Sequence, residues 1–234
     1  LVRTAFTSVS RGTESLVFNG QVPRAEYQRM RAPFQQGEFP GPVKYGYSNV
    51  GIVEAGPDDL VGCHVFSLYP HQTRFVAPTM VLHTIPDGVP LARAVLAANM
   101  ETALNALWDS GAGPADRIVV VGAGIVGLLM AYLAARLPGA QVIVIDPLNE
   151  RRGLVERLGA IYAPGPGSDP AGLTPAGTTG PGVTPAGSDP CAADVVFHTS
   201  ANPAGLATAI AAAGMEATVV ELSWYGDKPV AVPL

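Results

Sequence analysis

The sequence predicts an α/β protein in which a β-rich unit precedes a doubly wound parallel sheet. Over residues 1–90, short runs rich in Val, Phe and Tyr are broken by turn residues every 8 to 12 positions, a rhythm typical of a compact all-β unit. From residue 116 onward, apolar strands alternate with helical segments, which predicts a parallel sheet. Nearly half of the 234 residues are apolar and only 14% are charged, so the chain can build a sizeable core.

The boundary between the two predicted units falls near residue 100, which gives one unit at 1–100 and another at 101–234. Apolar residues recur at helical spacing over 91–111, so one helix is expected there. The strands expected in the second unit are 117–121, 141–146, about 160–163, 194–199 and 217–223, and its helices are about 125–136, 149–158 and 202–213. Gly159 and Gly214 are expected to end two of these helices.

A segment rich in Pro and Gly, 163–190, interrupts this alternation. It repeats Gly-Ser-Asp-Pro at 167–170 and 187–190. Such a composition cannot bury a core, so the segment is expected to be a surface loop in place of a crossover helix. A tolerated insertion is the favoured interpretation.

The stretch from Ile118 to Ala135 contains 18 residues without a charge, which is long enough for a membrane span. Three glycines within it favour a strand, a turn and a buried helix instead. Gly122 permits the tight turn, Gly124 lets a pyrophosphate approach the backbone, and Gly127 lets the helix lie close to the strand. Two residues of the motif, Ile125 and Val126, would add free N–H groups at the start of the helix that hold the phosphates. We therefore predict dinucleotide binding and no membrane span.

The choice of dinucleotide depends on an acidic residue at the end of the next strand. Asp146 lies 19 residues beyond Gly127, where a carboxylate hydrogen-bonds the adenosine ribose. A carboxylate there repels the 2′-phosphate of NADP, so NAD is favoured. Arg151 and Arg152 keep NADP as the alternative, because a guanidinium can bind that phosphate. His198 ends another strand at the same edge, so contact with the nicotinamide side of the cofactor is expected.

Charge and cysteine usage exclude several other classes of protein. The net charge is −5, and the sequence has no basic stripe that would bind nucleic acid. Cys63 and Cys191 are far apart in sequence and form no metal-binding pair, which agrees with a reducing, cytoplasmic location. No signal peptide is visible. The chain begins at Leu1 without a methionine, and it is expected to be part of a longer protein.

Several motifs, taken in order, resemble the medium-chain dehydrogenase/reductase superfamily. They are "SRGTE" at 10–14, "VKYGYSNVGIVEAG" at 43–56, "VGCHVF" at 61–66, "HTIPDGVPLARAVLAANMETALNAL" at 83–107, and the glycine motif. The resemblance implies a GroES-like catalytic domain followed by a Rossmann domain, with the cofactor between them. It also implies a small-molecule substrate. A homodimer is a separate expectation that the resemblance does not supply.

The departures from the family pattern concern zinc. Arg11, Tyr47 and the vicinity of Ala98 stand where the resemblance places the usual ligands of the catalytic zinc. Arginine keeps its proton and alanine has no donor atom, so these residues cannot form that site. The four-cysteine lobe that holds a structural zinc in the family is also absent. The resemblance therefore implies a zinc-free branch with no metal ligands.

Hydride transfer without zinc needs other groups to stabilise charge and deliver a proton. Arg11 is a candidate for stabilising the alkoxide, Tyr47 for donating the proton, and Thr13 matches the family's hydroxyl relay position. Glu14 is expected to orient Arg11. In the alternative interpretation, Arg11 and Glu14 form a structural ion pair and Tyr47 is a packed aromatic residue.

Two function classes follow from these observations. The first is an NAD-dependent oxidoreductase acting on an alcohol or a carbonyl compound without zinc. The second is a nucleotide-binding or assembly module that has lost catalysis together with zinc.

Overall fold

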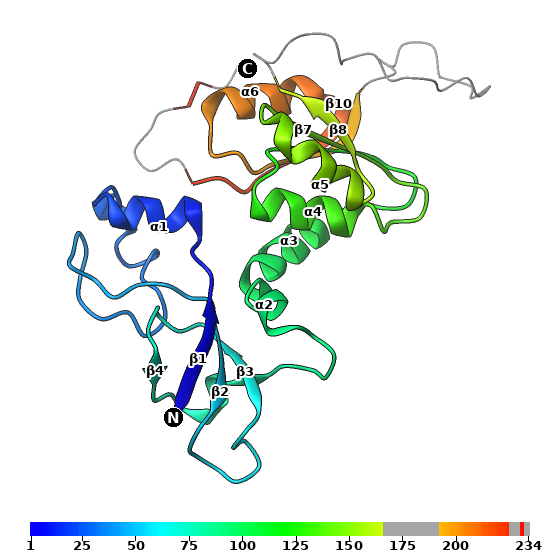
Figure 1. Cartoon of the computed structure of the whole chain (residues 1–234). Helices are drawn as coiled ribbons and strands as arrows, with labels where there is room; N and C mark the ends of the chain where they lie inside the picture. Colours follow the sequence, from blue (N-terminus) through cyan, green and yellow to red (C-terminus); the bar gives the residue numbers. More distant parts are fainter. Residues whose placement is uncertain (166–191, 225–229, 232–234) are drawn as a thin grey trace. The chain divides into compact units, whose positions relative to one another are not determined.

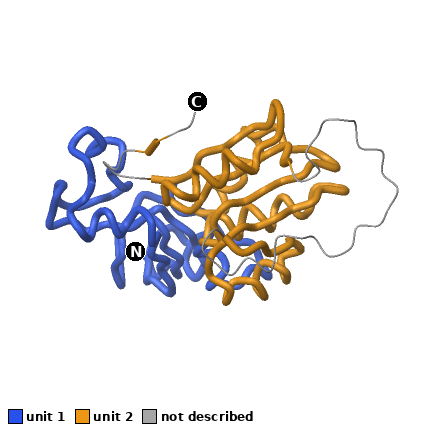
Figure 2. The backbone as a smooth tube through the Cα atoms, turned by 90° about the horizontal axis from the view of Figure 1, so that it is seen from above, with its two compact units in different colours: residues 1–98, 226–228 blue, residues 99–225, 229–234 orange. Residues whose placement is uncertain are grey.

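The structure is a computed structural model that describes residues 1–165, 192–224 and 230–231. It divides the chain into two compact units, shown in different colours in Figure 2. Unit 1 comprises Leu1–Ala98, and unit 2 begins at Asn99.

Unit 1 is built on an antiparallel sheet of five strands in the order β4-β1-β2-β3-β5. Its helices and strands, in chain order, are β1 (Val2–Thr7), α1 (Arg11–Phe18), η1 (Arg24–Glu26), β2 (Asn49–Val53), β3 (His64–Ser67), β4 (Arg74–Phe75), η2 (Thr79–Val81), β5 (His83–Thr84) and α2 (Leu91–Ala94). Strands β1, β2 and β3 alternate in direction, and their apolar side chains Val2, Val53 and Val65 share one buried cluster. This is the β-rich unit that the turn rhythm predicts.

Unit 2 is built on a parallel sheet in the order β10-β9-β6-β7-β8. Its elements are α3 (Ala97–Ser110, which starts two residues before the unit boundary), β6 (Arg117–Val121), α4 (Ile125–Ala134), β7 (Gln141–Asp146), η3 (Asn149–Arg151), α5 (Arg152–Arg157), β8 (Ile161–Pro164), β9 (Ala193–His198), α6 (Pro203–Ala212) and β10 (Ala213–Glu221). The order of the strands reverses between β6 and β9, because β6 is followed by β7 on one side and by β9 on the other. A reversal of this kind is where doubly wound sheets bind their ligands.

Helices cover both faces of the sheet of unit 2. Ile118 and Val120 of β6 belong to a buried cluster with residues of α3, α4 and α5, whereas Val119 and Val121 pack in a second cluster with Ala209 of α6. Figure 1 shows α4 and α5 on one side of this sheet and α6 on the other. Successive side chains of a strand point to opposite faces, so a strand that is covered twice needs apolar residues at every position.

The uncharged stretch therefore has a structural explanation. It supplies strand β6, the glycine turn and helix α4. No helix in the described residues is long and apolar enough to cross a membrane.

Three sequence-based expectations about secondary structure are wrong in detail. The helix expected over 91–111 is broken into α2 and α3, because the chain turns at Val95, which is buried against Val50 and Phe66. Gly214 does not end a helix, since β10 begins at Ala213 directly after α6. Strand β8 extends to Pro164, inside the segment expected to be a loop; positions 166–190 of that segment lie outside the described residues.

The expected strands at 117–121 and 141–146 have the predicted bounds, and α5 ends as predicted before Gly159, whose φ is +92°. In β6 and α5, the apolar pattern and the following glycine indicate the same end of the element.

The close approach of α4 to β6 gives a first prediction. A Cβ atom at Gly127 would lie 1.9 Å from the backbone oxygen of Gly122, which cannot move without distorting the turn. Gly127→Ala should therefore lower the free energy of unfolding by about 2–3 kcal/mol, as overpacking does in other cores. Urea unfolding followed by circular dichroism measures this loss.

The matched control is Gly124→Ala in the same motif. A Cβ atom at Gly124 meets nothing within 4 Å, and the φ of −73° suits alanine. This variant should unfold within about 0.5 kcal/mol of the unmutated chain. Equal losses in the two variants would contradict the close packing assigned to Gly127.

Candidate functional site

The glycine turn after β6 is held by the neighbouring strands of unit 2. Gly122 has a φ of +105° and donates its N–H to the carbonyl of Ile145 over 2.8 Å. A Cβ atom there would lie 3.0 Å from the backbone of Ser200. The hydroxyl of Thr199 donates to the carbonyl of Gly122 over 2.8 Å. The turn therefore needs glycine both for its backbone conformation and for the contact with the end of β9.

The start of α4 offers backbone donors at an open position. Gly124 is the N-cap, and the helix that follows has ten residues from Ile125. The first N–H groups of a helix have no acceptor within it, so those of Ile125, Val126 and Gly127 remain for a ligand. With no atom within 4 Å of a Cβ built at Gly124, the backbone there is accessible to a phosphate.

Asp146 is buried beneath this turn. Its side chain is only 4% exposed, and its carboxylate accepts three hydrogen bonds. The donors are the backbone N–H groups of Ala123 at 2.7 Å and Leu148 at 2.8 Å, and the guanidinium of Arg151 at 2.8 Å. A carboxylate has about four acceptor positions, so one remains for a ribose hydroxyl.

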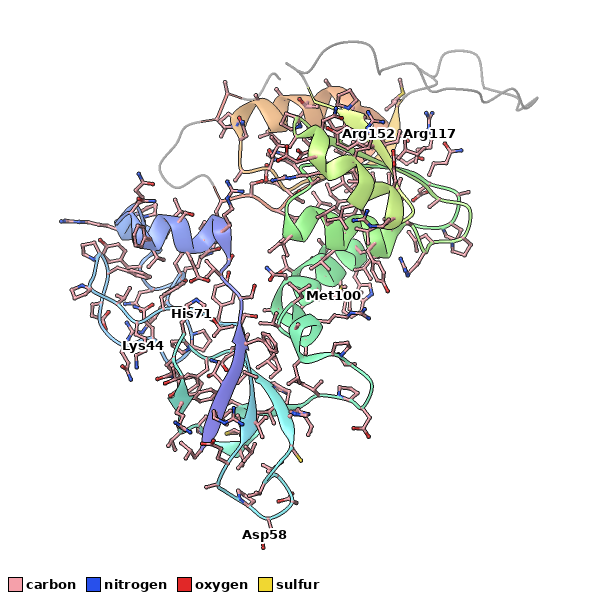
Figure 3. The ribbon with its side chains drawn as sticks, in the orientation of Figure 1. Lys44, Asp58, His71, Met100, Arg117 and Arg152 are labelled. Atoms are coloured by element: carbon pink, nitrogen blue, oxygen red, sulfur yellow. The ribbon has the colours of Figure 1, made fainter. Side chains whose placement is uncertain are left out.

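The two arginines that follow Asp146 are both engaged. Arg151 is ion-paired with Asp146, and its side chain is 26% exposed. Arg152, labelled in Figure 3, lies over the ring of Tyr162 at 4.8 Å and contacts Glu156 at 3.8 Å. Neither guanidinium is an uncommitted phosphate-binding group.

His198 ends β9, and its side chain is fully buried. Nδ1 lies 2.8 Å from Glu221, and Nε2 lies 2.7 Å from the hydroxyl of Ser200. The imidazole hydrogen-bonds to Ser200, whose backbone lies next to Gly122, and the expected contact of His198 with the nicotinamide side of the cofactor stays a prediction.

The candidate catalytic residues of unit 1 lie on and near α1. Arg11 begins the helix with its side chain exposed, and Thr13 is half-buried. Glu14 accepts from the backbone N–H of Ser10 at 2.7 Å and contacts Nε2 of His71 at 2.7 Å. Glu14 therefore orients His71 and not Arg11, and no Arg11–Glu14 ion pair is found in the described part of the chain.

Tyr47 and Tyr45 form an edge-to-face pair with ring centroids 6.2 Å apart. Tyr45 is buried, and its hydroxyl donates to the carbonyl of Met30 over 2.6 Å. Burial, followed by the charges of Tyr47 and Glu14, raises the pKa of Tyr45 to about 12. Tyr47 is half-buried, and no lysine or arginine among the described residues hydrogen-bonds to its hydroxyl. The cation expected beside it is not present in this arrangement.

Sequence reasoning missed His71. It follows β3 in "YPHQ", with no motif to mark it, and is labelled in Figure 3. The structure brings it into hydrogen-bonding contact with Glu14 and Thr7. Only the fold could reveal this contact, because Glu14 and His71 are 57 positions apart in the sequence.

The donor atoms in this cluster do not suit zinc. Arg11, Tyr47 and Ala98 supply no neutral nitrogen, thiolate or carboxylate, and Ala98 packs with the apolar cluster around Val95. Glu14 and His71 offer two ligands, whereas catalytic zinc takes three from the protein. Throughout the described residues, no three His, Cys, Asp or Glu side chains gather as a metal ion requires.

Together, the antiparallel sheet, the parallel sheet and the glycine turn at the strand reversal define a two-unit α/β fold. No protein-family model matches the sequence. An uncharacterised zinc-type alcohol dehydrogenase-like protein of Haemophilus influenzae is 38% identical over 82 residues, which are 35% of this chain and 24% of that protein. The D-guloside 3-dehydrogenase of Escherichia coli is 26% identical over 183 residues, which are 70% of this chain and 52% of that protein.

Solved structures share the fold. A provisionally assigned zinc-binding dehydrogenase of Sinorhizobium meliloti, bound to NADP, superposes with a TM-score of 0.73 at 18% identity, covering 99% of this chain and 71% of that one. An alcohol dehydrogenase of Escherichia coli complexed with NADH superposes with a TM-score of 0.62 at 17% identity, covering 80% and 63%. These relatives and structural neighbours are zinc-type alcohol dehydrogenase-like proteins and related dehydrogenases, and this chain has their α/β fold, with an antiparallel sheet in one unit and a parallel sheet in the other. The chain spans about a quarter to a half of the length of the two curated relatives.

The raised pKa of Tyr45 gives a prediction for unit 1. In the unfolded chain a tyrosine ionises near 10.0, whereas Tyr45 in the folded chain keeps its proton until about pH 12. Its contribution to stability is thus complete below pH 10 and is lost as the pH rises from 10 to 12. Thermal unfolding measured between pH 9 and 12 should show this decline, and Tyr45→Phe should reduce it. An identical decline in the variant would contradict the burial of an un-ionised Tyr45.

Proposed function

We propose that the chain belongs to an NAD-dependent oxidoreductase that transfers a hydride between a nicotinamide cofactor and an alcohol or carbonyl substrate without zinc. The observation that carries the proposal is the turn at Gly122–Gly127. Its backbone is open at Gly124, and the N–H of Ala123 donates a hydrogen bond to the carboxylate of Asp146. Dehydrogenases among the relatives support the reaction class.

Backbone groups and Asp146 would hold the cofactor. The N–H groups of Ile125, Val126 and Gly127 face the position of the pyrophosphate in this proposal, and Gly124 leaves room for it. The remaining acceptor position of Asp146 would receive a hydroxyl of the adenosine ribose. When bound, the nicotinamide accepts or supplies the hydride at its C4 atom.

The preference for NAD over NADP also follows from Asp146. Its carboxylate would face the 2′-phosphate of NADP, and its ion pair occupies Arg151, the nearest cation. Arg152 is held by Tyr162 and Glu156. Binding NADP would require breaking one of these arrangements.

Arg11 and Tyr47 remain the proposed substrate-facing groups of unit 1. The exposed guanidinium of Arg11 can stabilise negative charge on the substrate oxygen, as a charged donor does in other active sites. The hydroxyl of Tyr47 can hydrogen-bond to the same oxygen. Thr13, which is half-buried on α1, stays a candidate relay hydroxyl.

The substrate class that we propose is a secondary alcohol of a polyhydroxy compound, or the matching ketone. It is supported by the name of the relative D-guloside 3-dehydrogenase, which indicates oxidation at a ring hydroxyl of a sugar derivative. The alternative, a nucleotide-binding module without catalysis, has no observation of its own in its favour.

The cofactor preference is testable by fluorescence titration. The unmutated protein should bind NADH at least roughly tenfold more tightly than NADPH, a difference of about 1.4 kcal/mol. Asp146→Asn should narrow this ratio, because it removes the charge and releases Arg151. Asp109→Asn, an exposed acid on α3, is the control and should leave the ratio unchanged. Equal affinity of the unmutated protein for both cofactors would defeat the assignment of Asp146.

Zinc content tests the second half of the proposal. Protein purified without added metal and dialysed against a chelator should contain well under one zinc per chain by elemental analysis, because Arg11, Tyr47 and Ala98 supply no zinc ligands. It should also reduce NAD⁺ with an alcohol at the same rate before and after the chelator. One zinc per chain that survives dialysis would mean that other residues form a zinc site.

A further inference from the structure

Three side chains that are distant in the sequence form a hydrogen-bonded chain in unit 1. Thr7 is the last residue of β1, Glu14 lies on α1, and His71 follows β3. Nε2 of His71 lies 2.7 Å from Oε2 of Glu14, and Nδ1 is hydrogen-bonded to the hydroxyl of Thr7. The order hydroxyl, imidazole, carboxylate is one that enzymes use to move a proton.

The backbone holds the imidazole in this position. The N–H of His71 donates to the carbonyl of Tyr45 over 3.0 Å, and its ring lies against Gly46. A Cβ atom at Gly46 would approach Cδ2 and Nε2 of the ring to 2.6 Å, so the ring occupies the space that any other residue would fill. Glu14 is fixed in turn by the N–H of Ser10. The ring is therefore placed by contacts from three separate segments.

The direction of the hydrogen bonds follows from the chemistry of the three groups. An ionised carboxylate can only accept a hydrogen bond, so Nε2 of a neutral His71 carries the proton toward Glu14. Nδ1 then has a lone pair, and it accepts from the hydroxyl of Thr7. The oxygen of Thr7 keeps its own lone pairs for another hydroxyl group.

Burial decreases from the carboxylate to the hydroxyl. The side chain of Glu14 is 12% exposed and that of His71 is 30% exposed, while Thr7 is exposed. The chain is thus closed at its charged end and open at its hydroxyl end. In unit 2, Ser200, His198 and Glu221 have the same three types of group, but the imidazole there is fully buried. Of these two hydrogen-bonded chains, the one in unit 1 has the partly exposed imidazole and the exposed hydroxyl, so we assign the proton exchange with a substrate to it.

We propose that Thr7, His71 and Glu14 take up the proton of the substrate hydroxyl during alcohol oxidation and return it during carbonyl reduction. This inference rests on the proposed function and deepens it. The C–H bond of the alcohol breaks, and its electron pair goes with the hydrogen to C4 of the nicotinamide. The O–H proton passes to Oγ1 of Thr7 as the proton of Thr7 passes to Nδ1 of His71. The alcohol is oxidised by two electrons, the nicotinamide is reduced, and the imidazolium beside Glu14 releases the proton to solvent.

The division of labour in unit 1 follows from this proposal. Tyr47 and Arg11 hydrogen-bond to and stabilise the substrate oxygen, whereas the proton ends on His71. Glu14 is a positioning residue, since it acts through His71 and stabilises its charged form.

The test is steady-state oxidation of sorbitol and of 2,3-butanediol by the purified protein, followed as NAD⁺ reduction. His71→Gln should lower kcat by a factor of about 10² to 10⁴, the usual contribution of a general base, with KM changed less than about threefold. Thr7→Val keeps the shape of the side chain and removes the hydroxyl, so it should lose activity to a similar extent. Thr7→Ser restores the hydroxyl and should recover most of kcat. His64→Gln, an exposed histidine at the start of β3, is the matched control and should have native activity.

The outcomes separate this inference from the proposed function. If the unmutated protein oxidises an alcohol but His71→Gln or Thr7→Val keeps more than a third of kcat, the inference is overturned and the proposed function stands. If the unmutated protein reduces no NAD⁺ with either alcohol, the proposed function fails and the inference fails with it. Covalent labelling of Thr7 by diisopropyl fluorophosphate would show a nucleophile in place of a relay and would also overturn the inference.

A second measurement does not depend on the folding of any variant. In the unmutated protein, ¹⁵N NMR of histidine should show His71 protonated at Nε2 and unprotonated at Nδ1 when the ring is neutral. The opposite tautomer would reverse the direction of the hydrogen bonds and overturn the proposal.

Discussion

Unit 2 depends on the hydrogen bonds of one buried carboxylate, that of Asp146. It joins the glycine turn through Ala123, the end of its own strand through Leu148, and the following helix through Arg151. Removing the carboxylate would leave the N–H groups of Ala123 and Leu148 without this acceptor, and the loss at the buried Ala123 costs about 1–3 kcal/mol. The backbone oxygen of Asp146 also accepts from the hydroxyl of Tyr162, so β7 and β8 meet at the same residue.

This attachment gives the glycine turn its shape before any ligand arrives. Thr199 and Ser200 hold the turn from the side of β9, and Asp146 holds it from below. When a turn already has its bound conformation, ligand binding does not have to order it, and less binding free energy is lost. Backbone donors at the start of a helix can then bind a pyrophosphate tightly. The open backbone at Gly124 agrees with the proposed use of the turn.

Unit 2 was more predictable from sequence than unit 1, for physical reasons. Strand β6 is covered on both faces. Its apolar run and the glycines that follow it therefore predict the strand and the turn from neighbouring residues alone. The break at Val95 was not predictable, because it depends on packing against Val50 and Phe66 from another part of the chain. His71 was missed for the same reason: its partners Thr7 and Glu14 are set by the sheet, and a loop histidine carries no periodic signal.

The most direct test of the central claim is calorimetric titration of NADH into the unmutated protein and into Gly124→Ala. The account predicts saturable binding by the unmutated protein and a loss of at least about tenfold in the variant, because the added methyl group occupies the space of the pyrophosphate while the fold is kept. Equal binding by both proteins, with the variant folded as judged by circular dichroism, would contradict the assignment of the glycine turn as the cofactor site.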